Sequence, residues 1–479
     1  MNIKEVKAEL KRILQAQFQR DEKGVYKVPV ENRRVILLAG PEGIGKKSVL
    51  QQVATECGAE LVSCNMAHIT EEMARGESRV EEKRYGGRKY TVLDYTMSEV
   101  VATVYDAMEK TDNRQGILFV EDINLADREL VPVMWQLVQE KRMGKYQVPR
   151  EYNIVLSMSV PAVHPAIREF PVEVGSKILR LDAEPDLAVW KEYADKQMLH
   201  PVVISYLDQN PEHFFDMNIA ETAVDFVTPA GWEDLSAMLY AYESLGHKVS
   251  VELVLSYLRK ENIAEAFTVY FDEFQQVPAT YRMPEILDGG VFKRSIKKLQ
   301  KAPDSGRALL FGWLRGHLRK VLREWYRCQR VTEEVIPVFE DWKMRLAKED
   351  AWDDTSFTKL LADYEERRQE MLSESGTDKD KAICMDMASE FLQEESMNIF
   401  GAMTSDDQQA YEIVMEDFAK YQKGVEEQAA QIAKSMEYIR SFILEALQDE
   451  AVCDDFEKEI YEGFYGAYYR NRNDSRCGK

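Results

Sequence analysis

The stretch Gly40-Pro41-Glu42-Gly43-Ile44-Gly45-Lys46 decides the fold of this 479-residue chain. It fits the pattern G-x-x-x-x-G-K and lies between an aliphatic run, Val35–Leu38, and a segment typical of a helix, Lys47–Cys57. Glycines allow backbone N–H groups to turn inward around phosphates, and the N-terminus of a helix adds a favourable partial charge. We therefore expect a phosphate-binding loop in which Lys46 contacts the β- and γ-phosphates of a nucleotide.

The pattern around this loop predicts an α/β domain. Between the aliphatic runs, Met97–Lys110 and Leu130–Lys141 have the apolar spacing of helices. Short strands that alternate with helices indicate a parallel, doubly wound sheet. Four runs besides Val35–Leu38 are expected to be its strands: Glu60–Cys64, Ile117–Val120, Asn153–Leu156 and Lys177–Leu181.

After residue 182 the strand signal fades, and the rest of the chain reads as helices. We therefore expect four parts: an N-terminal helix and lead-in (1–30), an α/β nucleotide-binding domain (31–182), a helical lid (183–275) and an all-helical C-terminal region (276–479). Two apolar stripes in the last part are expected to pack inside a helical bundle, with a partner-docking face as the alternative. They are the heptad-spaced Val425, Ala429, Ile432, Met436, Ile439 and Ile443, and the aromatic Tyr461, Phe464, Tyr465, Tyr468 and Tyr469.

Composition indicates a folded globular protein. Hydrophobic residues make up 45% and charged residues 30% of the chain, and no apolar run approaches the roughly 20 residues that span a bilayer. The N-terminus lacks the apolar core of a signal peptide, so we expect a cytoplasmic protein. The six cysteines are scattered without a CxxC pair, which argues against a disulfide framework or a zinc site.

Charge is unevenly distributed along the chain, whose net charge is −22. Residues 331–479 hold 36 acidic and 17 basic residues, whereas 291–330 hold 12 basic and 2 acidic ones. An acidic surface repels phosphate, so we expect no nucleic-acid partner and no DNA motor. The basic amphipathic helix over 311–330 could bind a membrane surface or nucleic acid, but we expect its arginines to face the acidic tail.

The residue after Lys46 departs from the usual phosphate-loop pattern. A serine or threonine at that position places a hydroxyl on Mg²⁺, but this chain has Lys47. Ser48 follows about 100° further around the helix, so it cannot simply substitute. A second cation can partly replace the charge of the metal but not its coordination geometry.

An acidic pair, Glu121-Asp122, follows the strand Ile117–Val120. In a P-loop ATPase this position supplies one carboxylate toward Mg²⁺ and a second that polarises the attacking water. The usual order is Asp then Glu, so Glu121 is one methylene too long for the metal and Asp122 one too short for the water. A misplacement of about 1 Å can cost on the order of 10²-fold in rate. An ordinary exposed acidic turn is the alternative.

Two further candidates lie beyond the acidic pair. Ser159 ends the next strand, where a polar side chain helps to orient the water near the γ-phosphate. Arg168 follows it and could reach the nucleotide of a neighbouring subunit, although a surface arginine in a local ion pair is an equal alternative.

Together these residues resemble the AAA+ ATPases, and within them the MoxR-type group. The resemblance covers roughly residues 1–330. The motifs that carry it are GPEGIGK (40–46), GILFVEDIN (116–124) and REF (168–170), together with YTMSEV (95–100) and FVTPAGWEDLS (226–236).

The resemblance implies a ring, expected to be a hexamer, with ATP between subunits. It also implies chaperone-like remodelling of a partner, in some cases beside a von Willebrand A-domain protein. By resemblance, Glu121 stands at the Mg²⁺-binding position, Ser159 at a sensor that is normally Asn, and Arg168 at the arginine finger. Ala230 stands where a sensor arginine is expected. The residues implied to bind ATP are Gly40, Pro41, Glu42, Gly43, Ile44, Gly45, Lys46, Lys47 and Ser48.

Five of these positions are altered relative to the family pattern: Lys47, Glu121, Asp122, Ser159 and Ala230. All five changes weaken hydrolysis, whereas the glycines and Lys46 that bind phosphate remain. Two functions therefore stay open: a remodelling protein that hydrolyses ATP, even if slowly, and a scaffold or regulatory subunit that binds ATP without turnover.

Overall fold

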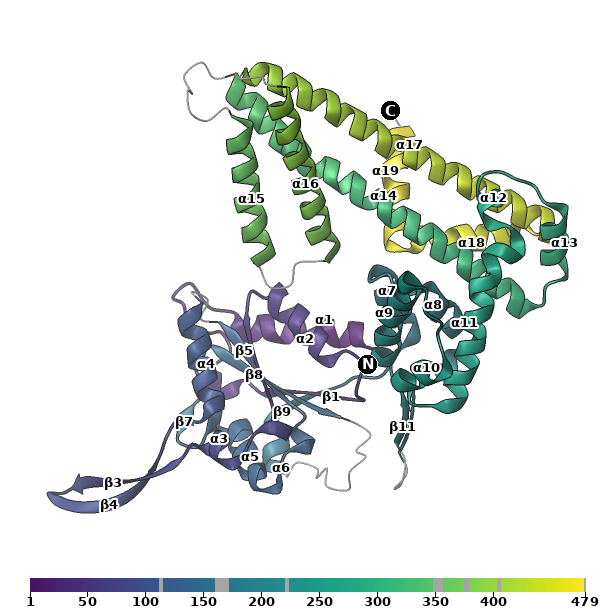
Figure 1. Ribbon diagram of the computed structural model, residues 1–479. Coiled ribbons are helices and arrows are strands. Elements are labelled where there is room, and N and C mark those ends of the chain that lie inside the picture. The colour runs from purple at the N-terminus through teal and green to yellow at the C-terminus, as the bar shows by residue number, and fades with distance from the viewer. Residues whose placement is uncertain are drawn as a thin grey trace. The chain divides into compact units, whose positions relative to one another are not determined.

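The structure is a computed structural model that describes residues 1–111, 115–159, 172–219, 224–347, 356–373, 379–402 and 406–477 (Figure 1). The chain forms two compact units. The first unit comprises Met1–Trp190 and Phe214–Trp232, and the second comprises Lys191–His213 and Glu233–Lys479. The four-part division expected from the sequence stays a prediction.

The first unit is built on a parallel five-stranded sheet, which confirms the expected α/β fold. The strand order is β2-β5-β8-β1-β9, so β1 lies between β8 and β9 and the phosphate loop leaves from inside the sheet. All five strands coincide with the runs expected from the sequence. They are β1 (Val35–Gly40), β2 (Glu60–Asn65), β5 (Gly116–Glu121), β8 (Tyr152–Ser159) and β9 (Ile178–Asp182).

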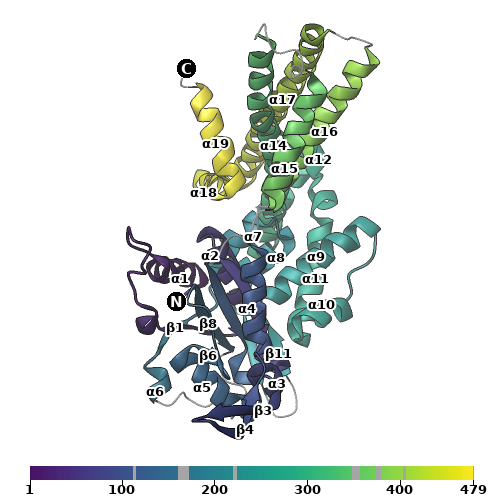
Figure 2. The ribbon, with the colours of Figure 1, turned by 90° about the vertical axis from the view of Figure 1, so that its left-hand side faces the viewer.

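Helices cover both faces of this sheet, which is why the central strands β1, β5 and β8 are almost entirely buried, whereas the edge strands β2 and β9 also carry polar, partly exposed residues. Side chains alternate between the faces, so Ile36 and Leu38 pack with α1 and α2, whereas Leu37 packs with α4 and α5. Figure 2 shows α1 and α4 on opposite sides of β1 and β8. The helices of this unit are α1 (Ile3–Phe18), α2 (Lys46–Glu56), α3 (Glu71–Arg75), α4 (Glu99–Lys110), α5 (Val131–Glu140) and α6 (Val172–Gly175).

Three two-stranded hairpins were not predicted from the sequence. The longest, β3 (Ser78–Tyr85) with β4 (Arg88–Tyr95), is exposed along almost its whole length, so neither face has the apolar alternation of a half-buried strand. The third hairpin lies within 183–275, where the sequence indicated short helices with a turn and no strand. The two shorter hairpins are β6 (Arg142–Met143) with β7 (Tyr146–Gln147), and β10 (Asp216–Ile219) with β11 (Val224–Val227).

The second unit is helical in its described residues. Two long helices, α14 (Asp304–Leu346) and α17 (Asp407–Leu447), pack against each other and against most of the remaining helices. α7 (Leu187–Lys196) and α9 (Pro229–Leu245) cross from one unit to the other. The remaining helices are α8 (Pro201–Gln209), α10 (Val251–Leu258), α11 (Glu261–Tyr281), α12 (Met283–Leu287), α13 (Lys293–Lys301), α15 (Phe357–Ser373), α16 (Lys379–Gly401), α18 (Glu450–Glu462) and α19 (Phe464–Cys477).

Both apolar stripes of the C-terminal region pack inside the second unit, as expected. All six heptad-spaced residues of α17 are buried. In the aromatic stripe, Tyr465 and Tyr469 are buried, and the Tyr469 ring meets the Trp325 ring of α14 edge-on at 5.0 Å between centroids. Only Phe464 of the stripe is markedly exposed. The stripes therefore contribute to the core of the helical unit.

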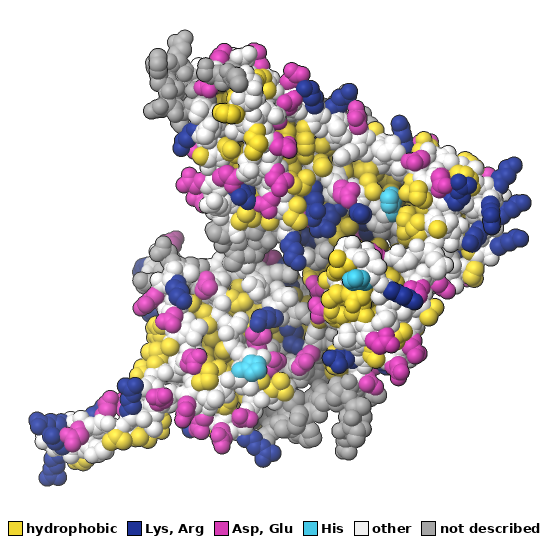
Figure 3. Space-filling view, viewed as in Figure 1, with side chains coloured by type: hydrophobic (Ala, Val, Ile, Leu, Met, Phe, Trp, Pro, Cys, Tyr) yellow, Lys and Arg dark blue, Asp and Glu magenta, His cyan; other side chains and the backbone are white. Residues whose placement is uncertain are grey.

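The basic residues of the stretch 291–330 are divided between two helices, α13 and α14. α13 exposes its lysines and Arg294 to solvent, and Figure 3 shows this dark-blue patch. On α14, Arg323 and Arg327 both bind the buried carboxylate of Asp380, as expected for arginines that face the acidic tail. Arg319 differs, because it pairs with Asp195, outside that tail. Among the described helices, none is long and apolar enough to cross a membrane.

Asp380 is the centre of this charge network. Its carboxylate accepts hydrogen bonds from Arg323 and Arg327 and from the hydroxyl of Tyr465, and it is 6% exposed. Burial alone would raise the pKa of Asp380, but the hydrogen bonds from Arg323, Tyr465 and Arg327 lower it below its usual value. The carboxylate is therefore ionised at neutral pH and joins α14, α16 and α19.

We expect Asp380→Ala to lower the free energy of unfolding by about 3 kcal/mol or more, because it leaves two guanidinium groups without their buried partner. The measurement is the urea concentration at the midpoint of unfolding, with far-ultraviolet circular dichroism as the probe. Asp455→Ala is the matched control, because Asp455 is exposed on α18, and it should cost less than about 0.5 kcal/mol. Equal midpoints for the two variants would contradict a structural role for this network.

Candidate functional site

The phosphate loop connects the buried strand β1 to the start of α2. Gly43 and Gly45 have φ values of +74° and +93°, in the left-handed region that favours glycine. Within the described part of the chain, the N–H groups of these two glycines donate no backbone hydrogen bond. Because α2 begins directly after Gly45, the positive end of its dipole points at the same place. The loop therefore has the local geometry of an anion-binding site.

Lys46 is folded back onto the loop. Its Nζ donates hydrogen bonds to the carbonyl oxygens of Gly40, at 2.8 Å, and Pro41, at 2.7 Å. Burial lowers the pKa of Lys46, and the carboxylates of Asp122 and Glu42 act against that shift. A phosphate bound in the loop would compete with the two carbonyl oxygens for this ammonium group.

The two residues altered at the metal-binding positions form an ion pair with each other. Lys47 Nζ at the start of α2 lies 2.8 Å from Glu121 Oε1 at the end of β5. The Glu121 side chain is 16% exposed and that of Lys47 is 58% exposed. The sequence indicated that each residue departs from the usual pattern, but it did not indicate that they meet.

Asp122 is held by residues that the sequence did not indicate. It has a φ of +54°, its Oδ2 accepts a hydrogen bond from Asn65 Nδ2 at 2.8 Å, and its own N–H donates to Ser157 Oγ at 3.2 Å. Asn65 ends β2 and lies in register with Glu121 on β5. Asn65 could have been predicted from the sequence, because it is a polar residue at the end of the strand that neighbours β5. Asp122 is thus bound to its neighbouring strands.

Ser159 lies against the phosphate loop. Its Oγ donates a hydrogen bond to Glu42 Oε1 at 3.0 Å, and its N–H donates to Asn124 Oδ1 at 3.1 Å. The parallel pairing of β1 with β8 sets Ser159 opposite Gly40, which explains the contact. Asn124 is a further site residue that sequence reasoning missed. Arg168, the expected arginine finger, lies outside the described residues.

The start of α9 packs on the same loop. Ala230 N–H donates to Gly43 O at 3.0 Å, and Gly231 N–H donates to Thr228 Oγ1 at 3.1 Å. A Cβ at Gly43 would lie 2.8 Å from Thr228 Cβ, so the approach is as close as a glycine permits. Ala230 therefore reaches the site through its backbone, and its methyl group brings no charge to a nucleotide.

The residues at the predicted metal position lack two features of the usual site for Mg²⁺. This ion requires near-octahedral oxygen ligands at about 2.0–2.1 Å. Here an ammonium group already binds Glu121, and position 47 offers no hydroxyl. Among the described side chains, no group of three or more His, Cys, Asp or Glu could hold a metal ion.

A glycine loop between a buried strand and a helix, at the carboxyl edge of a parallel sheet, defines the P-loop class of nucleotide-binding domain. Residues 36–135 match the family described as "ATPase family associated with various cellular activities (AAA)". The first unit therefore contains an AAA ATPase domain.

The remaining comparisons add little to this assignment. A mutant of the RuvB protein of Thermotoga maritima is similar at 12% identity and a TM-score of 0.30, over 59% of this chain and 78% of that one. No curated protein matches the chain. The roles of the individual site residues stay predictions.

We expect Gly43→Ala to destabilise the first unit more than Gly24→Ala. Gly24 has a similar φ of +77°, but a Cβ added there would meet no heavy atom within 4 Å, so its substitution tests backbone strain alone, about 1–2 kcal/mol. Gly43→Ala adds the clash with Thr228, on the order of 1 kcal/mol more. Thermal unfolding of both variants measures the difference, and equal losses would argue against close packing between α9 and the loop.

Proposed function

We propose that this chain is a MoxR-type AAA+ nucleotide-binding protein that uses ATP binding, with at most slow hydrolysis, to remodel or activate a partner protein. The observation that carries the proposal is the glycine loop with Lys46 at the carboxyl edge of the parallel sheet. The AAA domain match over 36–135 and the resemblance of the lid motif to the MoxR-type group support it.

A second function, a regulatory subunit that binds ATP without turnover, is favoured by the engagement of both carboxylates. Glu121 Oε1 is paired with Lys47, and Asp122 Oδ2 accepts a hydrogen bond from Asn65. A general base must lie within hydrogen-bond reach of the attacking water and must have a lone pair free to accept its proton. Each carboxylate keeps one oxygen without a described partner. Turnover is disfavoured instead by the cation beside Glu121, where the metal ion would bind, and by the reversed lengths of the two acidic side chains.

ATP binding itself is supported by two adjacent cations. Lys46 and Lys47 open α2, and the helix N-terminus adds its partial positive charge. The ammonium group of Lys47 supplies positive charge beside Glu121, where a metal ion would otherwise neutralise the carboxylate. We therefore propose that the affinity for ATP depends only weakly on Mg²⁺, although the family generally binds the two together.

The wider biology follows from the resemblance alone. AAA proteins typically form rings, so self-assembly into a hexamer with Arg168 at the subunit boundary is part of the proposal. A von Willebrand A-domain partner and a cytoplasmic location have no support beyond the sequence and stay predictions.

Lys46→Ala should weaken ATP binding by about 100-fold, because it removes a partly buried, charge-assisted contact to phosphate. Isothermal titration calorimetry with ATP measures the loss. Lys23→Ala, which removes an exposed lysine of the same unit, is the control and should leave the affinity unchanged. Unchanged affinity in Lys46→Ala would refute binding at this loop.

The same titration in EDTA and in excess Mg²⁺ tests the metal dependence. We expect the two dissociation constants to agree within about threefold, because an ion pair already neutralises Glu121. Phosphate release by the wild type should stay close to that of Lys46→Ala. A loss of ATP binding in EDTA would contradict the weak metal dependence, and turnover well above the blank would favour the remodelling ATPase over the regulatory subunit.

Restoring the usual residues should change both the Mg²⁺ dependence of ATP binding and the rate of phosphate release. The triple variant Lys47→Thr, Glu121→Asp and Asp122→Glu removes the ion pair and returns a hydroxyl and two carboxylates of the usual lengths. We expect its ATP binding to become Mg²⁺-dependent and its phosphate release to rise by at least tenfold, in line with the roughly 10²-fold cost of a misplaced group. The double variant Lys47→Thr and Glu121→Asp is the control that restores the metal position alone. No gain in the triple variant would place the catalytic defect elsewhere.

A further inference from the structure

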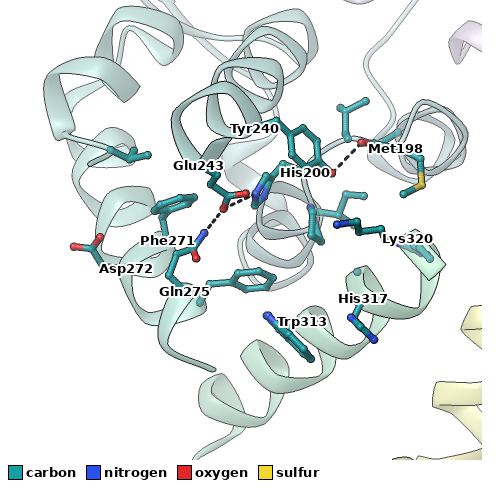
Figure 4. Close-up of a pocket in the computed structure, with 18 of the residues that line it drawn as sticks. Met198, His200, Tyr240, Glu243, Phe271, Asp272, Gln275, Trp313, His317 and Lys320 are labelled. Carbon is teal, nitrogen blue, oxygen red and sulfur yellow. Dashed lines mark hydrogen bonds and ion pairs between the residues drawn. The ribbon is translucent and has the colours of Figure 1, made fainter. Parts of the chain in front are cut away.

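A cavity of about 620 Å³ lies wholly within the second unit, between the helices α8, α9, α11 and α14 (Figure 4). Its volume is in the range of about 300–1,000 Å³ that small-molecule sites occupy. No residue of the phosphate loop or the acidic pair lines it. The proposed nucleotide chemistry therefore does not explain this cavity.

Aromatic side chains make up much of its wall. Phe271 and Phe274 of α11 are buried, and Tyr240 of α9 donates a hydrogen bond from its hydroxyl to Met198 O. Trp313 of α14 stacks flat on His317, with 5.3 Å between the ring centroids. These rings offer an apolar surface to part of a ligand.

A fixed polar group lies among these rings. His200 is buried, and its Nδ1 accepts a hydrogen bond from Val202 N–H at 3.3 Å. The ring hydrogen must therefore be on Nε2, which lies 3.0 Å from Glu243 Oε1 and donates to it. Gln275 donates to the same oxygen. Both described donors use Oε1, so Oε2 of Glu243 is available to a ligand.

Lys320 brings the opposite charge from α14. Figure 4 shows its side chain extending from that helix toward the pair of His200 and Glu243. Burial alone would raise the pKa of Glu243, but its hydrogen bonds from His200 and Gln275 and the charge of Lys320 lower it, so the carboxylate is ionised. No ion pair within 4.0 Å joins these two described side chains. Two opposite charges thus face one cavity without neutralising each other by contact.

The fixed charges of the lining balance. Three carboxylates and three cations belong to it, and of these Asp195 and Arg319 are paired with each other at 2.7 Å. A ligand with a net charge of either sign would gain at one side chain and lose at another. A neutral molecule with both an ammonium and a carboxylate group would gain at both.

We propose that this cavity binds a small zwitterion with an apolar side chain, of the class of the aromatic or large aliphatic α-amino acids. The ammonium group binds Glu243 Oε2, the carboxylate binds Lys320 Nζ, and the side chain packs against the rings of α11 and α14. Because several helices contribute to the lining, the bound ligand stabilises the second unit by mass action.

The first test is calorimetric titration of the full chain with L-phenylalanine and with two analogues that each lack one charge, phenylpropionate and phenethylamine. We expect the amino acid to bind and each analogue to bind at least about tenfold more weakly, because each leaves one charged side chain without its partner. Equal binding of the three compounds, or no binding of L-phenylalanine at millimolar concentration, would overturn the proposal. Stronger binding by a peptide with blocked ends would identify a protein-docking groove instead and would also overturn it.

Two variants locate the site. Lys320→Met removes a side chain that forms no ion pair among the described residues, so it should preserve the fold while it weakens L-phenylalanine binding by about tenfold. Glu243→Gln should do the same, and Lys298→Met on α13, outside the lining, is the matched control. The melting temperature without ligand separates lost binding from lost folding. Full affinity in Lys320→Met would exclude this cavity, and ATP titration of the same variant keeps this result separate from the nucleotide site.

Discussion

The burial of β1 between β8 and β9 is the constraint on which the first unit depends. All six residues of the strand are buried, with helices against both of its faces, so its end can neither slide nor tilt. The loop after Gly40 must therefore begin at a fixed point beside Ser159 of β8. The same constraint brings α9 onto Gly43, because only a residue without a Cβ leaves room for Thr228. The conformation of the glycines and the order of the strands thus together fix the position of the phosphate loop.

The central strands β1 and β5 were predictable because burial on both faces requires an apolar side chain at nearly every position. The β3–β4 hairpin was not predictable in this way, because its strands are stabilised by their pairing with each other and almost every side chain is exposed. The count of charges over residues 291–330 likewise did not distinguish α13 from α14. Only the structure separates the solvent-exposed lysines of α13 from the arginines of α14 that bind Asp380.

At the candidate site, the sequence indicated which positions are altered but not how the altered residues interact. Lys47 and Glu121 are 74 residues apart, and their contact depends on the order in which β5, β8 and β1 lie in the sheet. Asn65 belongs to yet another strand, whose register with Glu121 no local pattern specifies. Each substitution taken alone suggests a loss of function. Taken together, two of them form a pair whose charges compensate.

The ion pair between Lys47 and Glu121 affects how ATP, a polyanion, could bind at the phosphate loop. Three carboxylates lie close to the loop, and ATP without a metal would be repelled by each of them if they were free. Glu121 pairs with the cation Lys47. Asp122 and Glu42 accept from the neutral donors Asn65 and Ser159, which leave their charge in place, but Lys46 lies near both carboxylates. A partly exposed ion pair such as that of Lys47 contributes only about 0–1 kcal/mol to stability. Its ammonium group can therefore turn to a phosphate at little cost, and Glu121 then regains water as its partner, since part of its side chain remains exposed.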